Sequence, residues 1–285
     1  MFTCLYHTCI GRLILKFLTW PPLSRLAGRF LDTHFSRHLI PGFIRRNHLR
    51  MDDFIVEEWP SFNAFFTRKI RPEARPVDLA ADAFISPCDG LLRVYPIHEK
   101  LVLPVKDVPY SLPALLQNRR LAAEYEGGMC LVFRLTPSHY HRYVYPDKGR
   151  KSRNIFIPGI LHTVQPVATE TVPVYRRNSR EYTLLRTEHF GTITFMEVGA
   201  MMVGRICNYM EEGTFQKGQE KGRFEFGGST ILLLLQKDKV KLRSDWKEAW
   251  MQEREVPVKM GERIGRAVKK PDAAEHFPEN ENNFG

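Results

Sequence analysis

The chain has 285 residues, of which 43% are hydrophobic and 26% are charged, the usual range for a folded globular protein, which excludes wholesale disorder. Its 42 Lys and Arg residues outnumber its 32 Asp and Glu residues, so the formal net charge is +10. This charge predicts an anionic partner, either nucleic acid or an acidic membrane surface. The five cysteines are odd in number and scattered, which argues against a disulfide framework.

The first 50 residues carry most of the excess charge, with eight basic residues and one acidic residue. Apolar residues recur at three- and four-residue steps from Leu5 to Leu18, which predicts an amphipathic helix. Pro21 and Pro22 end that helix, and a second apolar stripe begins at Leu23. Such helices either pack on a core or lie on an anionic membrane. The charge favours the membrane, so residues 1–60 are predicted to form a membrane-association region.

The rest of the chain has mixed helix and strand signals, which predicts an α+β fold. A capped helix is expected over residues 61–66, a helical insertion over 101–125 and a loose polar tail over 271–285. No apolar run reaches the roughly 18 to 20 residues that span a bilayer, and no usable signal peptide is present. The predicted strands are Leu91–Tyr95, Cys130–Leu135, Tyr143–Tyr145, Ile155–Ile157, Tyr182–Leu185, Thr192–Val198 and Thr230–Leu235.

Two common motifs, one for phosphate binding and one for metal binding, are incomplete in this sequence. Gly213 and Gly218 have the spacing of a P-loop, but no Lys and Ser or Thr follow. His139 and His141 could share a strand face as a metal pair, but a third ligand is not evident, so no metal is predicted.

Four segments form a specific combination in this order along the chain. The segments are Phe62–Pro72 continuing to Ser86-Pro87-Cys88-Asp89-Gly90, Pro137–Tyr143, Val198–Gly204 and Gly222–Thr230. Together they resemble the phosphatidylserine decarboxylase family, a pyruvoyl-dependent and membrane-associated family, over nearly the whole chain.

The resemblance implies an enzyme that makes its own cofactor. Ser229 would attack the carbonyl of Gly228, and the chain would split into a β chain, 1–228, and an α chain, 229–285. Ser229 would become a pyruvoyl group, which forms a Schiff base with phosphatidylserine and releases CO2 and phosphatidylethanolamine. Glycine beside the serine leaves the carbonyl unshielded and tolerates backbone strain. Asp89, in a rigid Pro-Cys-Asp-Gly turn, would be the acidic member of an Asp-His-Ser triad.

The resemblance also implies a barrel-sandwich-like, mostly β catalytic core over residues 61–285. It implies peripheral attachment to the cytoplasmic side of the cell membrane, with the α and β chains of one proenzyme as partners and a homodimer as a further possibility. Nucleic acid is not expected as a partner, because no base-reading motif accompanies the positive charge.

The sequence departs from the family pattern at one position. Better-known members carry a second histidine three residues after His141, and here that position is Val144. Valine cannot accept a proton, so His162 is the predicted replacement in the triad, the alternative being a core histidine bonded to backbone. His141 is then expected to protonate the intermediate that forms after CO2 leaves.

Other interpretations stay open at this level. The chain could be a lipid-binding relative that does not cleave itself, a nucleic-acid-binding protein, or a pyruvoyl enzyme acting on a soluble amino acid. Arg68, Lys69 and Arg71 either attract the lipid phosphate, which is the favoured interpretation, or form a solvated basic loop.

Overall fold

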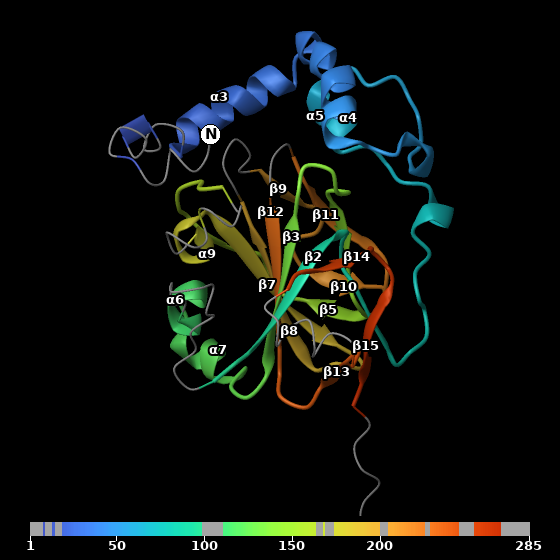
Figure 1. Cartoon of the computed structure of the whole chain (residues 1–285). Coiled ribbons are helices and arrows are strands. Elements are labelled where there is room, and N and C mark those ends of the chain that lie inside the picture. Colours follow the sequence, from blue (N-terminus) through green and yellow to red (C-terminus); the bar gives the residue numbers. More distant parts are fainter. Residues whose placement is uncertain are drawn as a thin grey trace, which may run out of the picture.

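The computed structural model describes residues 8, 13–14, 19–98, 111–163, 168, 174–199, 205–225, 229–244 and 254–268. A group of N-terminal helices lies across one end of a mostly β core (Figure 1). Most of the helix predicted between Leu5 and Leu18, and the tail predicted over 271–285, lie outside the described residues.

The N-terminal group consists of short helices. Its members are α3 (Pro21–Leu31), η1 (His34–Leu39), α4 (Ile40–Asn47), η2 (Met51–Asp53), α5 (Phe62–Phe66) and η3 (Pro72–Ala74). Helix α3 is the predicted second stripe, and it starts at the two prolines because proline suits the first helical turn. The capped helix predicted at residue 61 is confirmed as α5, where the Ser61 hydroxyl accepts the Ala64 N–H (3.2 Å).

Helix α5 joins the N-terminal group through aromatic packing. Phe62, Phe65 and Phe66 are buried together with Leu31 and Ile40. Burying each such side chain contributes about 1.5–3 kcal/mol, so a helix of five residues is held by packing rather than by its own propensity.

Nine described strands form one large antiparallel sheet. Its order is β10-β5-β7-β8-β12-β3-β2-β14, and β6 pairs with β7. The bounds are β2 (Gly90–Pro96), β3 (Met129–Leu135), β5 (Gly149–Lys151), β6 (Ile155–Ile157), β7 (Arg180–Thr187), β8 (Thr192–Val198), β10 (Gly213–Phe215), β12 (Ser229–Leu235) and β14 (Val256–Val258).

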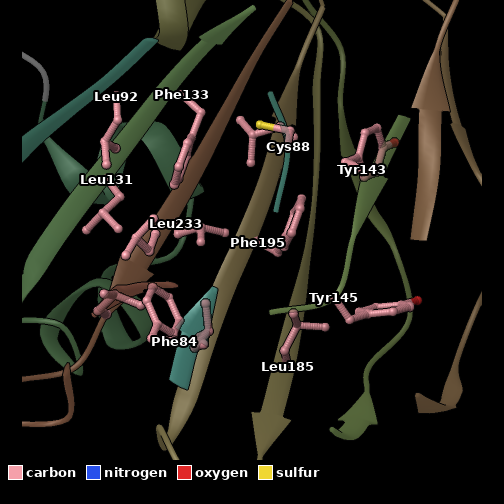
Figure 2. Close-up of a cluster of buried hydrophobic side chains, with 14 of the residues drawn as sticks. Phe84, Cys88, Leu92, Leu131, Phe133, Tyr143, Tyr145, Leu185, Phe195 and Leu233 are labelled. Carbon is pink, nitrogen blue, oxygen red and sulfur yellow. The ribbon is translucent and has the colours of Figure 1, made fainter. Parts of the chain in front are cut away.

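Two smaller sheets face one side of this sheet. One has the order β1 (Ala83–Ile85), β15 (Arg263–Ala267) and β13 (Val240–Leu242), and the other has β4 (Arg142–Val144), β11 (Glu220–Phe224) and β9 (Ile206–Asn208). Apolar side chains from all three sheets fill the space between them, among them Phe84, Leu131, Tyr143 and Phe195 (Figure 2).

The opposite side of the large sheet is covered by short helices. These are α6 (Leu112–Leu116), α7 (Arg119–Ala123) and α9 (Val174–Arg177), which lie beside the sheet in Figure 1. Residues 112–123 confirm the helical character predicted for 101–125, and 101–110 lie outside the described residues.

Strand β12 shows why this chain forms a layered core. Its residues alternate between the two apolar clusters, with Ile231, Leu233 and Leu235 on the side of the small sheets and Leu232 and Leu234 on the side of the helices. Because both faces are covered, the strand is apolar at nearly every position rather than at every second one.

Each predicted strand coincides with a strand of the structure to within about two residues, and the α+β class is confirmed. The described part of the large sheet ends in two separate strands, β10 and β14. The sheets are therefore open among the described residues, and the barrel-sandwich arrangement is not confirmed.

Candidate active site

Ser229 is the first residue of β12 and lies inside the core. Its side chain is 1% exposed, and its strand neighbour on β3 is Leu135. The Ser229 hydroxyl has no hydrogen-bond partner among the described residues. Leaving a buried hydroxyl unpaired costs about 1–3 kcal/mol, so Ser229 lowers the free energy of unfolding.

The pairing register places Ser229 in the middle of one end of the large sheet. One residue further along β12, at Thr230, the residues paired across the five strands from β2 to β7 are Leu91, Arg134, Thr230, Val198 and Arg180. The turn with Asp89 therefore lies two strands from Ser229 on one side, and the segment before β7 lies two strands away on the other. Neighbouring strands are about 4.8 Å apart, so each flank is about 10 Å from Ser229.

Asp89 occupies the β2 flank and is 5% exposed. The guanidinium of Arg75 donates to both carboxylate oxygens (2.8 and 2.6 Å), and the Met260 N–H donates to Oδ1 (2.9 Å). Within the part of the chain that the structure describes, Asp89 makes no hydrogen bond to a histidine. Its negative charge is thus balanced by Arg75, and its membership of a triad stays a prediction.

His141 is buried where the helices meet the small sheet. It is 1% exposed, and its ring lies 4.2 Å from that of Phe66 in α5. Its Nδ1 donates to the carbonyl of His139 (2.9 Å), so in the neutral ring Nε2 is the acceptor nitrogen. The Phe224 N–H donates to the His141 carbonyl (2.9 Å), so this histidine lies beside the strand that leads to Ser229.

His162 occupies the β7 flank and is held by Asn178. Its N–H donates to the Asn178 side-chain oxygen (2.9 Å), while the Asn178 amide nitrogen donates to the carbonyls of His162 (2.8 Å) and Gly199 (2.7 Å). Burial, with a smaller contribution from Arg177, lowers the pKa of His162 to about 4. The imidazole is therefore neutral at pH 7, the form that can accept a proton.

His139 lies between these flanks, and the sequence interpretation considered it only as a metal ligand. It follows β3, the strand between Asp89 and Ser229, and burial lowers its pKa. Its Nδ1 accepts the Thr136 N–H (2.9 Å), so the neutral ring carries its proton on Nε2 and acts as a donor. No group of three or more potential metal ligands occurs among the described residues.

Val144 fills the position at which the resemblance implies a histidine. It is packed among Ile85, Tyr140 and Met260, and its N–H donates to the carbonyl of Pro87 (2.8 Å). The side chain at this position therefore lies next to the turn that carries Asp89. In this chain valine occupies that place and Arg75 binds the carboxylate.

The sequence interpretation missed a buried ion pair on the same sheet face as Ser229. Lys221 in β11 donates to Glu197 in β8 and to Asn208 (2.6 Å), and both charged side chains are fully buried. Burial raises the pKa of Glu197 and lowers that of Lys221. The sequence signal that could have indicated this pair is Glu197, a charged residue in the otherwise mostly apolar predicted strand Thr192–Val198. The pair connects β11, which precedes Ser229, to β8, which flanks it.

Comparison with known proteins agrees with this geometry. The family model described as phosphatidylserine decarboxylase matches residues 62–266. The phosphatidylserine decarboxylase proenzyme of Ruminiclostridium cellulolyticum is 41% identical over 272 residues, covering 93% of this chain and 91% of that protein. Proenzyme 2 of Clostridium acetobutylicum is 40% identical over 262 residues (92% and 90%), and the Clostridium perfringens proenzyme is 38% identical over 266 residues (91% and 90%).

Proposed function

Because the chain belongs to the phosphatidylserine decarboxylase family, we propose that it cleaves itself before Ser229 and then converts phosphatidylserine into phosphatidylethanolamine and CO2. The observation that carries this proposal is the buried Ser229 hydroxyl, which has no partner among the described residues. A hydroxyl that no described residue holds by a hydrogen bond is available to attack the preceding carbonyl.

In the proposed self-cleavage, the Ser229 oxygen attacks the carbonyl carbon of Gly228. The neutral imidazole of His162 takes the hydroxyl proton, the C–N bond breaks, and the proton passes to the freed nitrogen, so the peptide becomes an ester. Elimination of this ester followed by hydrolysis releases ammonia and leaves a pyruvoyl group on residue 229. Asp89, the proposed acidic member of the triad, is assigned a long-range role: from the opposite flank its negative charge stabilises the protonated imidazole without contacting it.

Residue 229 suits a group of this kind, because it is buried at a sheet end, follows Gly228 and lies beside Leu135 of β3. The pyruvoyl carbonyl supplies the electron sink that loss of CO2 requires. His141 takes up a proton at Nε2 and, as the imidazolium, delivers it to the former α-carbon, while Nδ1 keeps its bond to the His139 carbonyl. Its packing against Phe66 excludes water from that proton transfer.

The two chains produced by cleavage should stay together. Strand β12 of the α chain pairs with β3 and β8 of the β chain along most of its length, and all of its residues are buried. The α chain therefore leaves only if the large sheet unfolds.

The N-terminal helices are proposed to bind an anionic membrane at the cytoplasmic side of the cell membrane. Apolar side chains are exposed there, among them Trp20, Leu26 and Phe35 (57%, 63% and 79%). Exposed arginines accompany them, namely Arg29, Arg37, Arg45, Arg46 and Arg50. Among the described residues no helix has the length and apolarity needed to cross a bilayer.

These helices also contact the segments that carry both candidate histidines. Phe66 of α5 touches His141, and the Thr19 carbonyl accepts the N–H of Leu161, the residue before His162 (3.1 Å). A membrane under the helices would therefore present lipid headgroups at the sheet end where Ser229 lies.

The experiment that tests this function is the mass of the denatured protein, followed by CO2 release from phosphatidylserine vesicles. Cleavage before Ser229 leaves 57 of 285 residues in the small chain, a fifth of 33.2 kDa or about 6.6 kDa. We expect the wild type to show this fragment and to release CO2, and Ser229→Ala to remain at 33.2 kDa. A wild-type chain that stays intact and binds the vesicles without releasing CO2 would support a non-processing lipid-binding relative instead.

A further inference from the structure

Arg68 differs from the other basic residues of its loop. Lys69 and Arg71 are exposed, whereas Arg68 is 1% exposed. Burial lowers the pKa of Arg68 to about 10, so its guanidinium still carries a positive charge at pH 7. The loop is therefore not a uniform solvated basic patch.

The surroundings of this charge are aromatic. The Arg68 guanidinium carbon lies 4.0 Å from the ring centroid of Phe54 and 4.8 Å from that of Phe65. Its Nη1 donates one long hydrogen bond to the Phe65 carbonyl (3.4 Å). Two aromatic faces hold the cation in place, but they do not neutralise it.

One edge of the Arg68 guanidinium has no partner. Its Nε and Nη2 atoms are buried without a hydrogen bond, and no carboxylate pairs with Arg68 among the described residues. A buried cation without an anion is strongly unfavourable. This edge therefore indicates a site for a ligand that carries negative charge.

Other arginines of the same chain show what this edge binds. Arg75 and Arg134 each use Nε and Nη2 to donate to both carboxylate oxygens of an acid, Asp89 and Glu255 respectively, at 2.5–2.8 Å. The same two atoms of Arg68 are free. The matching ligand presents two oxygens of one anionic group, as a carboxylate or a phosphodiester does.

Hydrogen bonds connect the loop that carries Arg68 to the residues on both sides of His141. Arg142 donates from Nε and Nη2 to the Thr67 carbonyl (2.8 and 2.6 Å). The Tyr140 hydroxyl accepts the Ile70 N–H (3.4 Å) and interacts electrostatically with Arg68. Arg68 thus belongs to a loop that is hydrogen-bonded to both chain neighbours of His141, the residue proposed to protonate the intermediate.

We propose that the Nε and Nη2 atoms of Arg68 bind the phosphodiester of the phosphatidylserine headgroup, an inference that rests on the function proposed above. The substrate has two anionic groups, but the carboxylate is lost in the reaction. An arginine on the carboxylate would stabilise the substrate more than the transition state and slow the reaction, whereas the phosphodiester keeps its charge throughout. Arg68 therefore sets substrate affinity and orientation.

The test compares Arg68→Met, Arg68→Lys and Arg119→Met in the full-length protein; Arg119 is an exposed arginine of α7 to which no role is assigned. Self-cleavage is measured first, by mass, and then kcat and KM on phosphatidylserine vesicles. We expect Arg68→Met to cleave itself fully and to raise KM by about 10- to 100-fold, the loss of charged hydrogen bonds, with kcat within about threefold. Arg68→Lys should recover part of the affinity, because lysine keeps the charge but not the two-pronged geometry, and Arg119→Met should behave as wild type.

A binding measurement keeps the inference testable without catalysis. Titration calorimetry with glycerophosphoethanolamine, which has no carboxylate, should show equal affinity for wild type and Arg119→Met and an affinity at least tenfold lower for Arg68→Met. Free serine and inorganic phosphate, used as separate probes, should bind more weakly, because one lacks the phosphate and the other lacks the rest of the headgroup.

Equal glycerophosphoethanolamine affinity in wild type and in both Arg68 variants overturns the inference. If Arg68→Met does not fold, an Arg68→Lys protein that cleaves itself and keeps the wild-type KM overturns it too. Failure of the proposed function looks different, because the wild type itself would then release no CO2.

Discussion

The two flanks of Ser229 differ in how they hold charge. On the β2 flank Asp89 is ion-paired with Arg75 and bonded to the Met260 N–H. On the β7 flank His162 is tied to Asn178, and burial keeps its imidazole neutral. A carboxylate paired with an arginine therefore lies on one side of Ser229, and a neutral imidazole lies on the other.

This difference shows how the proposed self-cleavage can proceed without a histidine at position 144, next to the turn that carries Asp89. With valine at position 144, the described carboxylate has no histidine bonded to it, and the neutral imidazole comes from another segment of the chain. Charge stabilisation and proton transfer would then be supplied from opposite sides of β12. The tests below separate these two contributions.

The largest expected effect comes from removing the proton acceptor. His162→Ala should slow self-cleavage by about 10²–10⁴-fold, the usual contribution of a general base. The measurement is the rate at which the 33.2 kDa chain converts into two fragments after synthesis in a cell-free system. His139→Ala is the matched control, since it removes a half-buried imidazole whose Nδ1 already accepts a backbone N–H, and it should cleave within about threefold of wild type.

A second substitution sharpens that result. Val144→His, added to His162→Ala, restores an imidazole next to the turn that carries Asp89 and should recover at least about tenfold of the lost rate. Cleavage of His162→Ala at the wild-type rate would show that the β7 flank is not the proton acceptor.

The intermediate effect comes from neutralising the β2 flank. Asp89→Asn should slow cleavage by about three- to tenfold, because a carboxylate on the opposite flank stabilises the protonated imidazole only at long range. It should also lower the free energy of unfolding by about 3 kcal/mol, since it leaves the charge of Arg75 buried without its partner. Asp147→Asn is the control: Asp147 is fully buried and bonded to His189 rather than to a proposed site residue, so it should lose stability without slowing cleavage. If the two variants lose stability alike and both cleave at the wild-type rate, Asp89 is only a structural partner of Arg75.

The smallest effect is that of pH on cleavage. The pKa of His162 is lowered from 6.5 to about 4, so the imidazole stays neutral down to about pH 5 and the cleavage rate should change by less than about threefold between pH 7 and pH 5. A midpoint near pH 6.5 instead would point to an imidazole with an ordinary pKa.

The same pKa shift predicts the sign of the stability change. Between pH 6.5 and about pH 4 the unfolded chain binds a proton at His162 that the folded chain does not. The contribution of His162 to stability is therefore complete above pH 6.5 and is lost as the pH falls toward 4. Urea unfolding of wild type and His162→Ala should show a smaller loss across this range in the variant.

Local patterns in the sequence were enough to predict several elements of the fold. The serine cap of α5, the apolar stripe of α3 and the apolar run of β12 depend on residues within a few positions of one another, and each was found where it was expected. The order of the four motifs likewise indicated the family without any three-dimensional information.

The electrostatic partners depended on the tertiary structure. Arg75 binds Asp89 across 14 positions, Lys221 binds Glu197 across 24, and Arg134 binds Glu255 across 121. The pairing register of distant strands decides which charges meet, and no local pattern contains that register. For the same reason the sequence could single out Arg68 as basic, but only the packing of Phe54 and Phe65 over it decided that its charge is buried with one edge unpaired.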